Sequence, residues 1–457
     1  MNIQNIVQHQ DNFFKSQKTK DINFKKKKLK LLLNEIKTRE KDIVNAVYND
    51  FKKPAYETVL SEISIIISEL KLMIKKIHKW SKPKRVLPSL LNFPSSAKIH
   101  SEPYGKTLII SPWNYPFQLA FAPIIGAVAA GNTVLLKPSE HTPHTSTIIK
   151  EIIETVFIPE HVTVIEGGVS IANKLLQIRW DYIFFTGSVS VGKIVAKAAA
   201  EFLTPTTLEL GGKSPCIIDN SANLELAAKR IVWGKFINCG QTCIAPDYVL
   251  IHSSVKDKFI SLFKQKLQKA YGKNPELSED FARIINTKNF NRLNDMIGDE
   301  TIAVGGQVNK EDCYISPTII DEPSPMSNVM QEEIFGPILP VISYNTEEEI
   351  DQIVSKFEKP LAFYIFSNQK NFTNKMISKY SFGGGTVNDT MVHFVNYKLP
   401  FGGVGESGIG SYHGKRSFDT FSHKKGVVSR GTWLDIPIRY APYKGKLKQL
   451  KMLIKLS

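Results

Sequence analysis

Short apolar segments alternate with amphipathic ones through the middle of the chain, and this alternation restricts the possible folds more than any other feature. In the first series, strands and helices are expected in turn over residues 107–110, 117–130, 133–137, 146–156, 162–166, 171–177, 182–185 and 193–202. The second series begins near Leu208, with a helix expected over 254–270 and strands over 215–218, over 248–252 and near Ala303, Thr318, Ile338 and Ala362. Strands that alternate with helices in this way form parallel, doubly wound sheets. We therefore expect an α/β protein with two such domains and a cleft between them.

The segments outside these two series have other patterns. Residues 24–80 repeat apolar side chains at helical spacing among Lys and Glu. Residues 81–96 are rich in Pro, Ser and Lys, which predicts a connector without regular structure. Residues 97–111 alternate as a pair of strands would, with an interruption at Pro103-Tyr104-Gly105.

The charge balance raises the question of a polyanionic partner. The chain has 457 residues, 42% of them hydrophobic and 22% charged, as is typical of a soluble globular protein. Its net charge of +16 indicates either affinity for nucleic acid or anionic membrane, or lysines spread over solvated helix faces. Lysines occur along the whole length, without an RNA-binding aromatic motif, a zinc finger or a helix-turn-helix pattern. No nucleic-acid partner is expected.

The C-terminal tail, residues 441–457, is the exception to this even spread of charge. Lys444, Lys448, Lys451 and Lys455 share one helical face, with leucines opposite and beside them. A basic amphipathic helix can lie on an anionic membrane surface. The other interpretation is a surface helix that packs on its own protein, so peripheral membrane contact stays open.

Cysteine usage predicts a reducing, cytoplasmic compartment. The four cysteines, Cys216, Cys239, Cys243 and Cys313, are too few for a disulfide framework. Cys239 and Cys243 are not spaced as C-x-x-C, and no second Cys/His pair completes a metal set, so no metal site is expected. The start of the chain lacks the apolar core of a secretory signal, and prolines and glycines interrupt the apolar stretch 119–136. No membrane-spanning helix is expected.

A thiol in a polar turn is the first candidate for chemistry. Residues 238–246 read Asn-Cys-Gly-Gln-Thr-Cys-Ile-Ala-Pro, which places Cys243 among small, polar and turn-forming residues. A thiol in such a turn can stay accessible and ionise, whereas one in an aliphatic strand usually cannot. The competing interpretation is a small buried hydrophobe, the commonest state of a free cysteine.

Two further segments could hold a nucleotide. A strand leads into Gly187-Ser188, and a helix with Gly192 in its first turn follows; free N–H groups at a helix start suit a phosphate. The turn is neither G-x-G-x-x-G nor a P-loop, because Ile194 stands where a P-loop needs Ser or Thr. Lys137 and Glu140 follow a buried strand, at the sheet edge where ligands of open α/β sheets bind. An ordinary βα loop and solvent-exposed edge residues remain the respective alternatives.

Three more positions offer groups for acid–base and oxyanion chemistry. Glu209 is a lone carboxylate in an apolar run, where a raised pKa suits a general base. Asn114 lies between two prolines after a strand, and its amide could donate to an oxyanion. Glu333 lies close to Phe335 and a turn, an arrangement that suits a ribose beside a flat ring.

Seven short segments of the chain, taken in order, are similar to segments of the aldehyde dehydrogenase superfamily. They are PWNYP (112–116), KPSE (137–140), FTGS (185–188), LELGGKSP (208–215), GQTC (240–243), EEIFGP (332–337) and PFGGVGESG (400–408). The likeness spans residues 30–425, and the segments 412–414 and 421–423 most resemble the class 3 branch, which includes fatty-aldehyde enzymes. Val189 and Glu406 depart from the usual residues, threonine and asparagine.

The resemblance implies oxidation of an aldehyde to a carboxylic acid with NAD or NADP. Cys243 is then the nucleophile, Asn114 and the Cys243 N–H the oxyanion donors, and Glu209 the base for thioester hydrolysis. It also implies a medium- or long-chain aliphatic or an aromatic substrate. The cofactor contacts it implies are Lys137 and Glu140 for the adenosine ribose, Gly187, Ser188 and Gly192 near the pyrophosphate, Glu333 for the nicotinamide ribose and Phe335 beside the ring.

Domain boundaries and assembly follow from the same resemblance. We expect a cofactor domain over 1–84 and 106–208, a catalytic domain over 209–404, and a small β bridge for oligomerisation over 85–105 and 405–440. A homodimer is expected, bridged near Ala97–Glu102 and Gly426. Two other functions stay open: transfer of the thioester to coenzyme A, and a non-enzymatic basic protein that binds membrane or nucleic acid. Cys239 is expected to be buried packing, with a protective disulfide as the alternative.

Overall fold

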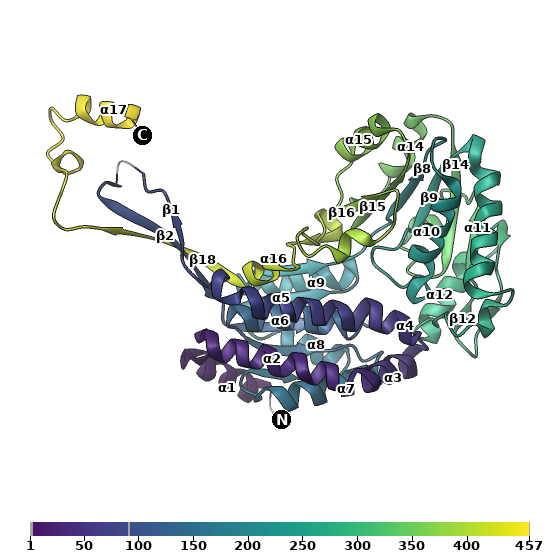
Figure 1. Ribbon diagram of the computed structural model, residues 1–457, viewed down its shortest axis with the longest axis horizontal. Coiled ribbons are helices and arrows are strands. Elements are labelled where there is room, and N and C mark those ends of the chain that lie inside the picture. Colours follow the sequence, from purple (N-terminus) through teal and green to yellow (C-terminus); the bar gives the residue numbers. More distant parts are fainter. Residues whose placement is uncertain (1–2, 90–91, 457) are drawn as a thin grey trace.

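The computed structural model describes residues 3–89 and 92–456 and places two α/β layers beside each other, with a narrow arm extending from one of them (Figure 1). The first layer is built on a six-stranded sheet in the order β17-β7-β6-β3-β4-β5. Its strands are β3 (Lys106–Ile110), β4 (Thr133–Lys137), β5 (Val162–Val164), β6 (Tyr182–Thr186), β7 (Thr206–Glu209) and β17 (Gly408–Ile409). All are parallel except β17, which runs antiparallel to β7.

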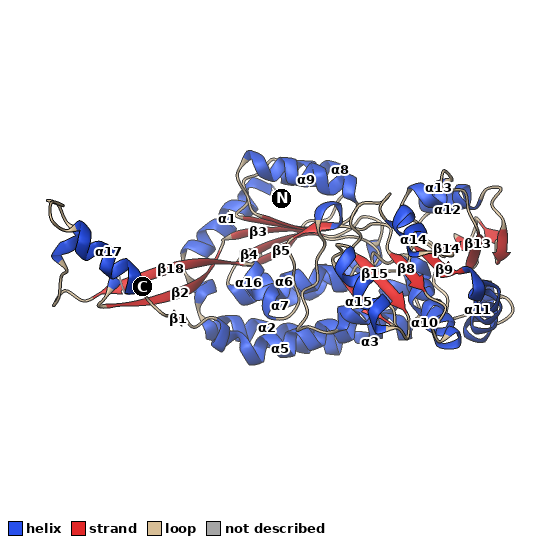
Figure 2. Cartoon of the chain, turned by 90° about the horizontal axis from the view of Figure 1, so that it is seen from above, coloured by secondary structure: helices blue, strands red, loops and turns tan. Residues whose placement is uncertain are grey.

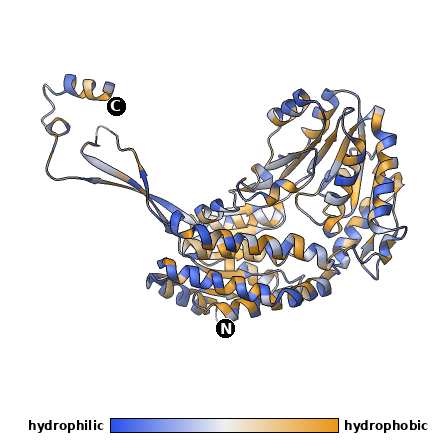
Figure 3. Cartoon of the chain, in the orientation of Figure 1, coloured by the Kyte–Doolittle hydropathy of each residue, from blue (hydrophilic) through white to orange (hydrophobic). Residues whose placement is uncertain are grey.

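Helices cover both faces of this sheet. One face packs on α6 (Gln118–Ala130) and α7 (Pro143–Val156), outside which lie α2 (Ile22–Thr38), α3 (Glu40–Phe51) and α5 (Ser64–Trp80). The other face packs on α1 (Ile3–Lys15), α8 (Val169–Leu176) and α9 (Val189–Glu201). Because both faces are covered, the central strands are continuous apolar runs rather than alternating ones. Figure 3 shows the matching pattern on the helices, with apolar stripes inward and polar stripes outward.

The second layer is a seven-stranded sheet in the order β10-β13-β14-β9-β8-β15-β16. Its strands are β8 (Pro215–Ile218), β9 (Tyr248–His252), β10 (Ile302–Val304), β13 (Thr318–Asp321), β14 (Ile338–Tyr344), β15 (Ala362–Phe366) and β16 (Gly384–Val387). All neighbours are parallel except β10 and β13. The helices of this layer are α10 (Leu224–Phe236), α11 (Lys256–Tyr271), α12 (Thr287–Ile297), α13 (Asn328–Gln331), α14 (Glu347–Val354) and α15 (Lys370–Lys379). A separate two-stranded sheet joins β11 (Val308–Asn309) and β12 (Tyr314–Ile315).

The arm is a three-stranded antiparallel sheet that leads to the C-terminus (Figures 1 and 2). It consists of β1 (Lys84–Val86), β2 (Ser95–Pro103) and β18 (Ser422–Arg430). The short helix α16 (Lys415–Thr420) directly precedes β18. The register pairs Ile99 with Gly426, so the two segments expected to form the bridge do pair. The helix α17 (Leu447–Leu456) lies beyond β18, away from both layers.

The expected two doubly wound sheets and their order along the chain are confirmed, and three local predictions need correction. Residues 84–86 form β1 instead of an irregular connector; all three side chains are exposed, so no apolar pattern marks the strand. β2 and β3 do not pair with each other but belong to different sheets. The tail helix begins at Leu447 and therefore excludes Lys444. The polar start of the chain, for which no helix or strand was predicted, forms α1, which buries Ile6 and Val7.

No helix in residues 3–89 and 92–456 combines the length and apolar character needed to cross a bilayer.

A buried ion pair fixes the loop that enters α6. Glu62 lies in a π-helical turn, η2 (Val59–Ile63), between α4 (Ala55–Thr58) and α5. Both Glu62 and Lys53 are fully buried, with 2.8 Å between Lys53 Nζ and Glu62 Oε1. The other oxygen of Glu62 accepts the N–H groups of Phe117 and Gln118, at 2.9 and 3.2 Å. One carboxylate therefore satisfies both a buried cation and free N–H groups at the start of α6.

We expect Glu62→Ala to lower the free energy of unfolding by about 3–5 kcal/mol, because it leaves a buried ammonium and two buried N–H groups without this acceptor. Urea titration followed by circular dichroism measures the loss. The control is Lys150→Ala, which breaks a pair whose two side chains are 41% and 40% exposed. A change below about 1 kcal/mol is expected there. Equal losses in the two variants would contradict the role of Glu62.

Candidate active site

Cys243 lies in a tight turn between α10 and β9. The chain leaves α10 through the short helix η4 (Ile237–Gly240), in which Asn238, Cys239 and Gly240 have φ values of 56°, 55° and 74°. Left-handed residues that are not glycine are uncommon and cluster at functional sites. A Cβ on Gly240 would lie 2.3 Å from the carbonyl oxygen of Gly336, so only glycine fits. The turn therefore packs directly against the segment that carries Glu333 and Phe335.

Side-chain amides hold this turn against the loop before α6. Asn114, which is 3% exposed, donates from Nδ2 to the carbonyl of Gln241 at 3.0 Å. Asn238 donates from Nδ2 to the carbonyls of Asn114 and Gln241 at 2.8 and 3.1 Å. Because an amide nitrogen carries two hydrogens, Asn114 keeps one N–H beyond its bond to Gln241. Asn114 thus lies beside the thiol turn with a donor to spare.

Cys243 and Glu209 line the same cavity, which has a volume of about 460 Å³. This size is within the usual range for small-molecule sites. Glu209 is the last residue of β7, 2% exposed, and neither of its carboxyl oxygens has a hydrogen-bond partner. Most of the remaining wall is apolar or aromatic, and it includes Leu60, Ile65, Leu72, Tyr115, Leu119, Trp233, Ile237, Met391, Phe394, Phe401 and Tyr412. The cavity joins a thiol and an unpaired carboxyl group in apolar surroundings.

Burial and like charge control ionisation in this cavity. Burial raises the pKa of the Cys243 thiol, the carboxylates of Glu333 and Glu209 raise it further, and the N–H groups of Cys243 and Ile244 oppose the shift. Burial also raises the pKa of Glu209 well above its usual value. The pKa of Glu333 rises to about 8, first through burial and then through Asp247, against the N–H of Gly212. Both carboxylates therefore disfavour the thiolate form of Cys243.

Four of the residues expected to bind a nucleotide lie at the carboxyl edge of the six-stranded sheet. Lys137 ends β4 and is 4% exposed, and its Nζ lies 2.5 Å from Glu140 Oε2. Gly187 follows β6 and donates its N–H to the carbonyl of Glu209 at 3.0 Å. Ser188 begins α9, and its Oγ accepts the N–H of Val191 at 3.4 Å. Ligands of open α/β sheets bind at this edge.

The other three residues expected to bind a nucleotide, Gly192, Glu333 and Phe335, lie at the junction between the two layers. Gly192 faces the side chain of Leu210, where a Cβ would be 2.6 Å from the nearest atom. The carboxylate of Glu333 lies against Gly211, only 2.2 Å from where a Cβ would stand. Phe335 has a φ of 51°, and its ring meets Trp113 edge-on with 5.3 Å between centroids. The predicted nucleotide-binding positions thus come from both layers, and none of the seven lines the cavity of Cys243.

Sequence reasoning missed the ion pair that holds the Glu333 segment. Lys213 is buried and pairs with Asp247, and its Nζ also donates to the carbonyls of Val329 and Glu332 at 2.8 Å each. Asp247 accepts the N–H of Ile334 at 2.8 Å. The lysine in the quoted LELGGKSP segment was visible in the sequence, but its partner is 34 residues away and no local spacing identifies it.

The apolar wall of the cavity was also missed, because it is assembled from distant segments. It combines residues of α5, of the loop near Met391 and of the loop at Tyr412. Glu69, in α5, is the unexpected polar member: its Oε1 has no partner, and burial raises its pKa to about 7. Glu406, the unexplained departure from the family pattern, forms an ion pair with Lys193 of α9 at 2.5 Å.

The two neighbouring thiols have different environments. Cys239 is fully buried in the core, and burial raises its pKa, whereas Cys243 is partly exposed at the cavity. All four cysteines are free. The burial of Cys239 in the core is the position that its predicted packing role requires.

The sheets and their junction define an α/β oxidoreductase of the dinucleotide-dependent kind. The chain belongs to the aldehyde dehydrogenase family, whose model matches residues 1–427. It is 47% identical over 445 residues to 4,4'-diaponeurosporen-aldehyde dehydrogenase of Staphylococcus aureus (strain NCTC 8325 / PS 47). The alignment covers 97% of each chain. It is 43% identical to a dimeric NADP-preferring aldehyde dehydrogenase of Rattus norvegicus, over 93% of this chain and 94% of that one.

Solved structures agree with this assignment. The substrate-bound state of Staphylococcus aureus AldH matches with a TM-score of 0.98 and 46% identity, over 99% of this chain and 100% of that one. The chain is therefore an oxidoreductase that acts on aldehydes, and its cofactor is NAD or NADP. The resemblance found in the sequence, and the activity and cofactor class expected from it, are confirmed.

We expect Glu333→Gln to speed alkylation of Cys243 by iodoacetamide, but only at alkaline pH. Glu333, with a pKa of about 8, is mostly neutral below that pH, and above it its negative charge opposes formation of the thiolate. Removal of that charge should raise the alkylation rate about three- to tenfold above pH 8. Mass spectrometry of the Cys243 peptide gives the rate. Glu332→Gln, the exposed neighbour, is the control, and a Glu333→Gln rate that matches it at every pH would contradict the coupling.

Proposed function

We propose that this enzyme oxidises medium- or long-chain aliphatic or aromatic aldehydes to carboxylic acids through a thioester on Cys243. The observation that carries this proposal is the shared cavity of Cys243 and Glu209, which has apolar walls and meets the carboxyl edge of the six-stranded sheet. The apolar walls fit a hydrocarbon substrate. A relative named for the 4,4'-diaponeurosporen aldehyde supports the same substrate class.

The proposed first half-reaction forms the thioester. The Cys243 thiolate bonds to the aldehyde carbon, and the carbonyl oxygen becomes an oxyanion. The free N–H of Asn114 and the backbone N–H of Cys243 donate to that oxygen; one such donor typically contributes about 10²–10³ in rate. As the oxyanion reforms the carbonyl, the carbon loses its hydrogen as hydride. NAD or NADP, when bound, accepts this hydride.

The proposed second half-reaction releases the acid. Glu209 takes a proton from water, and the water oxygen bonds to the thioester carbon. The carbon–sulfur bond then breaks, and the carboxylic acid leaves while Cys243 regains its thiol. The unpaired oxygens of Glu209 support this role, because neither has an existing hydrogen bond that a bound water would have to replace.

The residues at the junction fit a dinucleotide. Lys137 and Glu140 would hold the adenosine ribose, and Gly187, Ser188 and Gly192 would lie near the pyrophosphate, where the start of α9 offers N–H groups. Glu333 would hold the nicotinamide ribose, with Phe335 beside the ring. Gly211 supports this assignment, since the space that a Cβ would fill is taken by the Glu333 carboxylate. We also propose the domain boundaries expected from the sequence.

We expect Cys243→Ala to abolish aldehyde oxidation, and Glu209→Gln to allow one turnover of NADH or NADPH but slow every later one. The amide cannot take the proton from water, so the thioester should accumulate. Stopped-flow absorbance at 340 nm gives the burst, and intact-protein mass spectrometry detects the acylated chain. No burst in Glu209→Gln, or activity in Cys243→Ala, would contradict the assignments. Acyl-CoA in place of free acid would favour coenzyme A transfer.

We propose a homodimer joined through the arm. β18 is an edge strand, and its Val427 and Val428 are 39% and 50% exposed. An extended edge strand with unpaired N–H and C=O groups is a template for another chain. A relative named as dimeric supports this assembly.

We also propose a cytoplasmic enzyme whose tail touches the membrane surface. The four free cysteines support a reducing compartment. In α17, Lys448, Lys451 and Lys455 are exposed, and Leu447 is 63% exposed. An exposed helix with both kinds of side chain fits the surface of an anionic bilayer.

We expect deletion of residues 443–457 to reduce co-sedimentation with phosphatidylserine liposomes. Replacement of Lys448, Lys451 and Lys455 by Gln should weaken binding by about 1 kcal/mol per lysine, and salt should weaken wild-type binding. Phosphatidylcholine liposomes, which carry no net charge, are the control. Unchanged binding after the deletion would contradict the proposal.

A further inference from the structure

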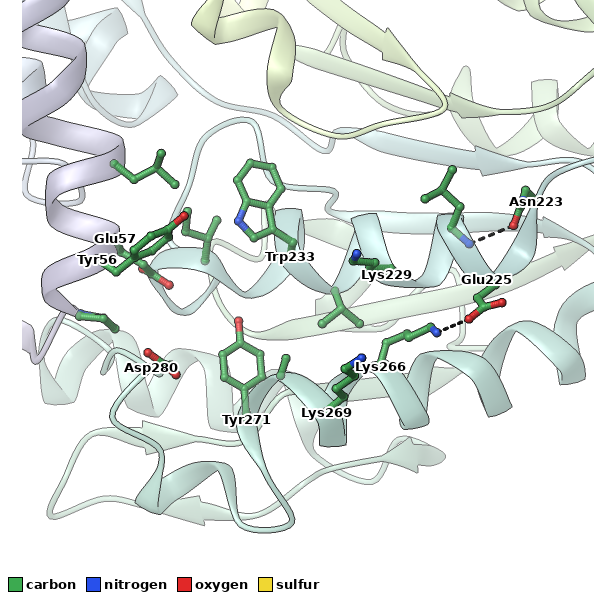
Figure 4. Close-up of a pocket in the computed structure, with 16 residues that line it drawn as sticks. Tyr56, Glu57, Asn223, Glu225, Lys229, Trp233, Lys266, Lys269, Tyr271 and Asp280 are labelled. Atoms are coloured by element: carbon green, nitrogen blue, oxygen red, sulfur yellow. Dashed lines mark hydrogen bonds and ion pairs between the residues drawn. The ribbon is translucent and has the colours of Figure 1, made fainter.

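A second cavity, of about 840 Å³, lies beside the substrate cavity between α4, α10 and α11 (Figure 4). The two cavities have three lining residues in common, Leu60, Trp233 and Ile237. Leu60 and Trp233 are 40% and 39% exposed, so they form a shared rim near the surface. The two cavities therefore adjoin along these three side chains.

Lysines gather on one side of the second cavity. On α10, Leu226, Lys229 and Trp233 line it at spacings of three and four residues, which places them on one helix face. Lys266 and Lys269 face them from α11. Figure 4 shows the three lysines on one side of Trp233 and Tyr271 together with Glu225, and Glu57 and Asp280 on the other side. Lys229 lies one helical turn before Trp233 in the sequence, on the side of Trp233 away from the rim.

Two of these lysines have no carboxylate paired with them. Lys266 forms an ion pair with Glu225 at 2.6 Å. Among the described residues, no ion pair joins Lys229 or Lys269 to an acid, although Lys269 lies close enough to Glu225 to help lower its pKa, after the larger effect of Lys266.

Two further acids of this cavity lie on its other side. Glu57 accepts the N–H of Asn238 at 2.8 Å, and Asp280 lies near it in the close-up view. The end of the cavity beyond Trp233 therefore carries three lysines and one acid, Glu225, whose ion pair is with Lys266.

We propose that the second cavity is a subsite for the far end of the substrate and that Lys229 and Lys269 bind a carboxylate there. This proposal rests on the proposed function, since it needs an aldehyde bound at Cys243 with a chain that reaches the rim. The substrate class it defines is long aldehydes with a carboxylate at the opposite end. The product would then be a dicarboxylic acid.

The two cavities give this selectivity a dependence on chain length. In a short substrate the carboxylate would stay among apolar walls, where an unpaired charge is strongly disfavoured. In a long substrate the methylene chain would fill the apolar cavity, and the carboxylate would pass Leu60 and Trp233 to reach the lysines. A terminal carboxylate should therefore hinder short aldehydes and be tolerated or favoured in long ones.

The test compares kcat/KM for pairs of aldehydes with 6, 10 and 16 carbons, each pair ending in a methyl group or a carboxylate. In the wild-type enzyme, we expect kcat/KM of the shortest carboxylated aldehyde to be at least about 100-fold below that of its methyl-ended partner. For the longest pair we expect little or no difference in kcat/KM. Lys229→Gln combined with Lys269→Gln should lower kcat/KM about tenfold for the long carboxylated aldehyde alone. Added salt should likewise lower kcat/KM of the wild-type enzyme for the long carboxylated aldehyde relative to its methyl-ended partner.

Matched controls separate this inference from the proposed function. Lys264→Gln, on α11 outside the cavity, should change none of the ratios, and hexanal should report an intact reaction site in every variant. If the double variant oxidises the long carboxylated aldehyde as well as wild type does, the subsite is wrong while long-chain oxidation stands. If the wild-type enzyme oxidises neither long aldehyde, the long-chain substrate class and the subsite are both wrong.

Discussion

A set of buried amide hydrogen bonds joins the two layers, and the geometry of the site depends on it. Asn114 belongs to the loop before α6, whereas Asn238 and Gln241 belong to the turn after α10. Their bonds cross more than 120 residues of sequence and fix the thiol turn in a strained, left-handed path. Glu62 fixes the same loop from the other side. A buried amide that loses its partner costs free energy, so these bonds specify one position for the turn.

The ionisable groups of the site would all carry negative charge. Cys243, Glu209 and Glu333 all become negative on ionisation, and each has a raised pKa. In apolar surroundings such groups ionise one at a time. The proposed mechanism uses these groups in separate steps, with the thiolate acting first and a carboxylate acting later.

The shape of the substrate route follows from helix packing in the outer part of the protein. The π-helical turn of η2 places Leu60 and Ser61 at the cavity, and α10 turns one face toward it. Leu226, Lys229 and Trp233 continue along that face into the second cavity. One helix therefore contributes both to the rim of the apolar cavity and to the charged region beyond it. If the proposed subsite is correct, a local change in α10 alters substrate choice without touching Cys243.

The sequence by itself determined the sheet architecture and named the candidate reacting groups. The βα alternation is local information, and seven short segments carry the thiol, the base candidate and the nucleotide-binding positions. The sequence also marked Glu209 correctly as a carboxyl group in apolar surroundings. It could not show β1, whose side chains are all exposed, nor the pairing of Lys213 with Asp247. Tertiary structure alone decided the cavity walls, the Glu62 ion pair and the second cavity. The physical reason is that these depend on contacts between segments far apart in the chain, which leave no periodic pattern in either segment.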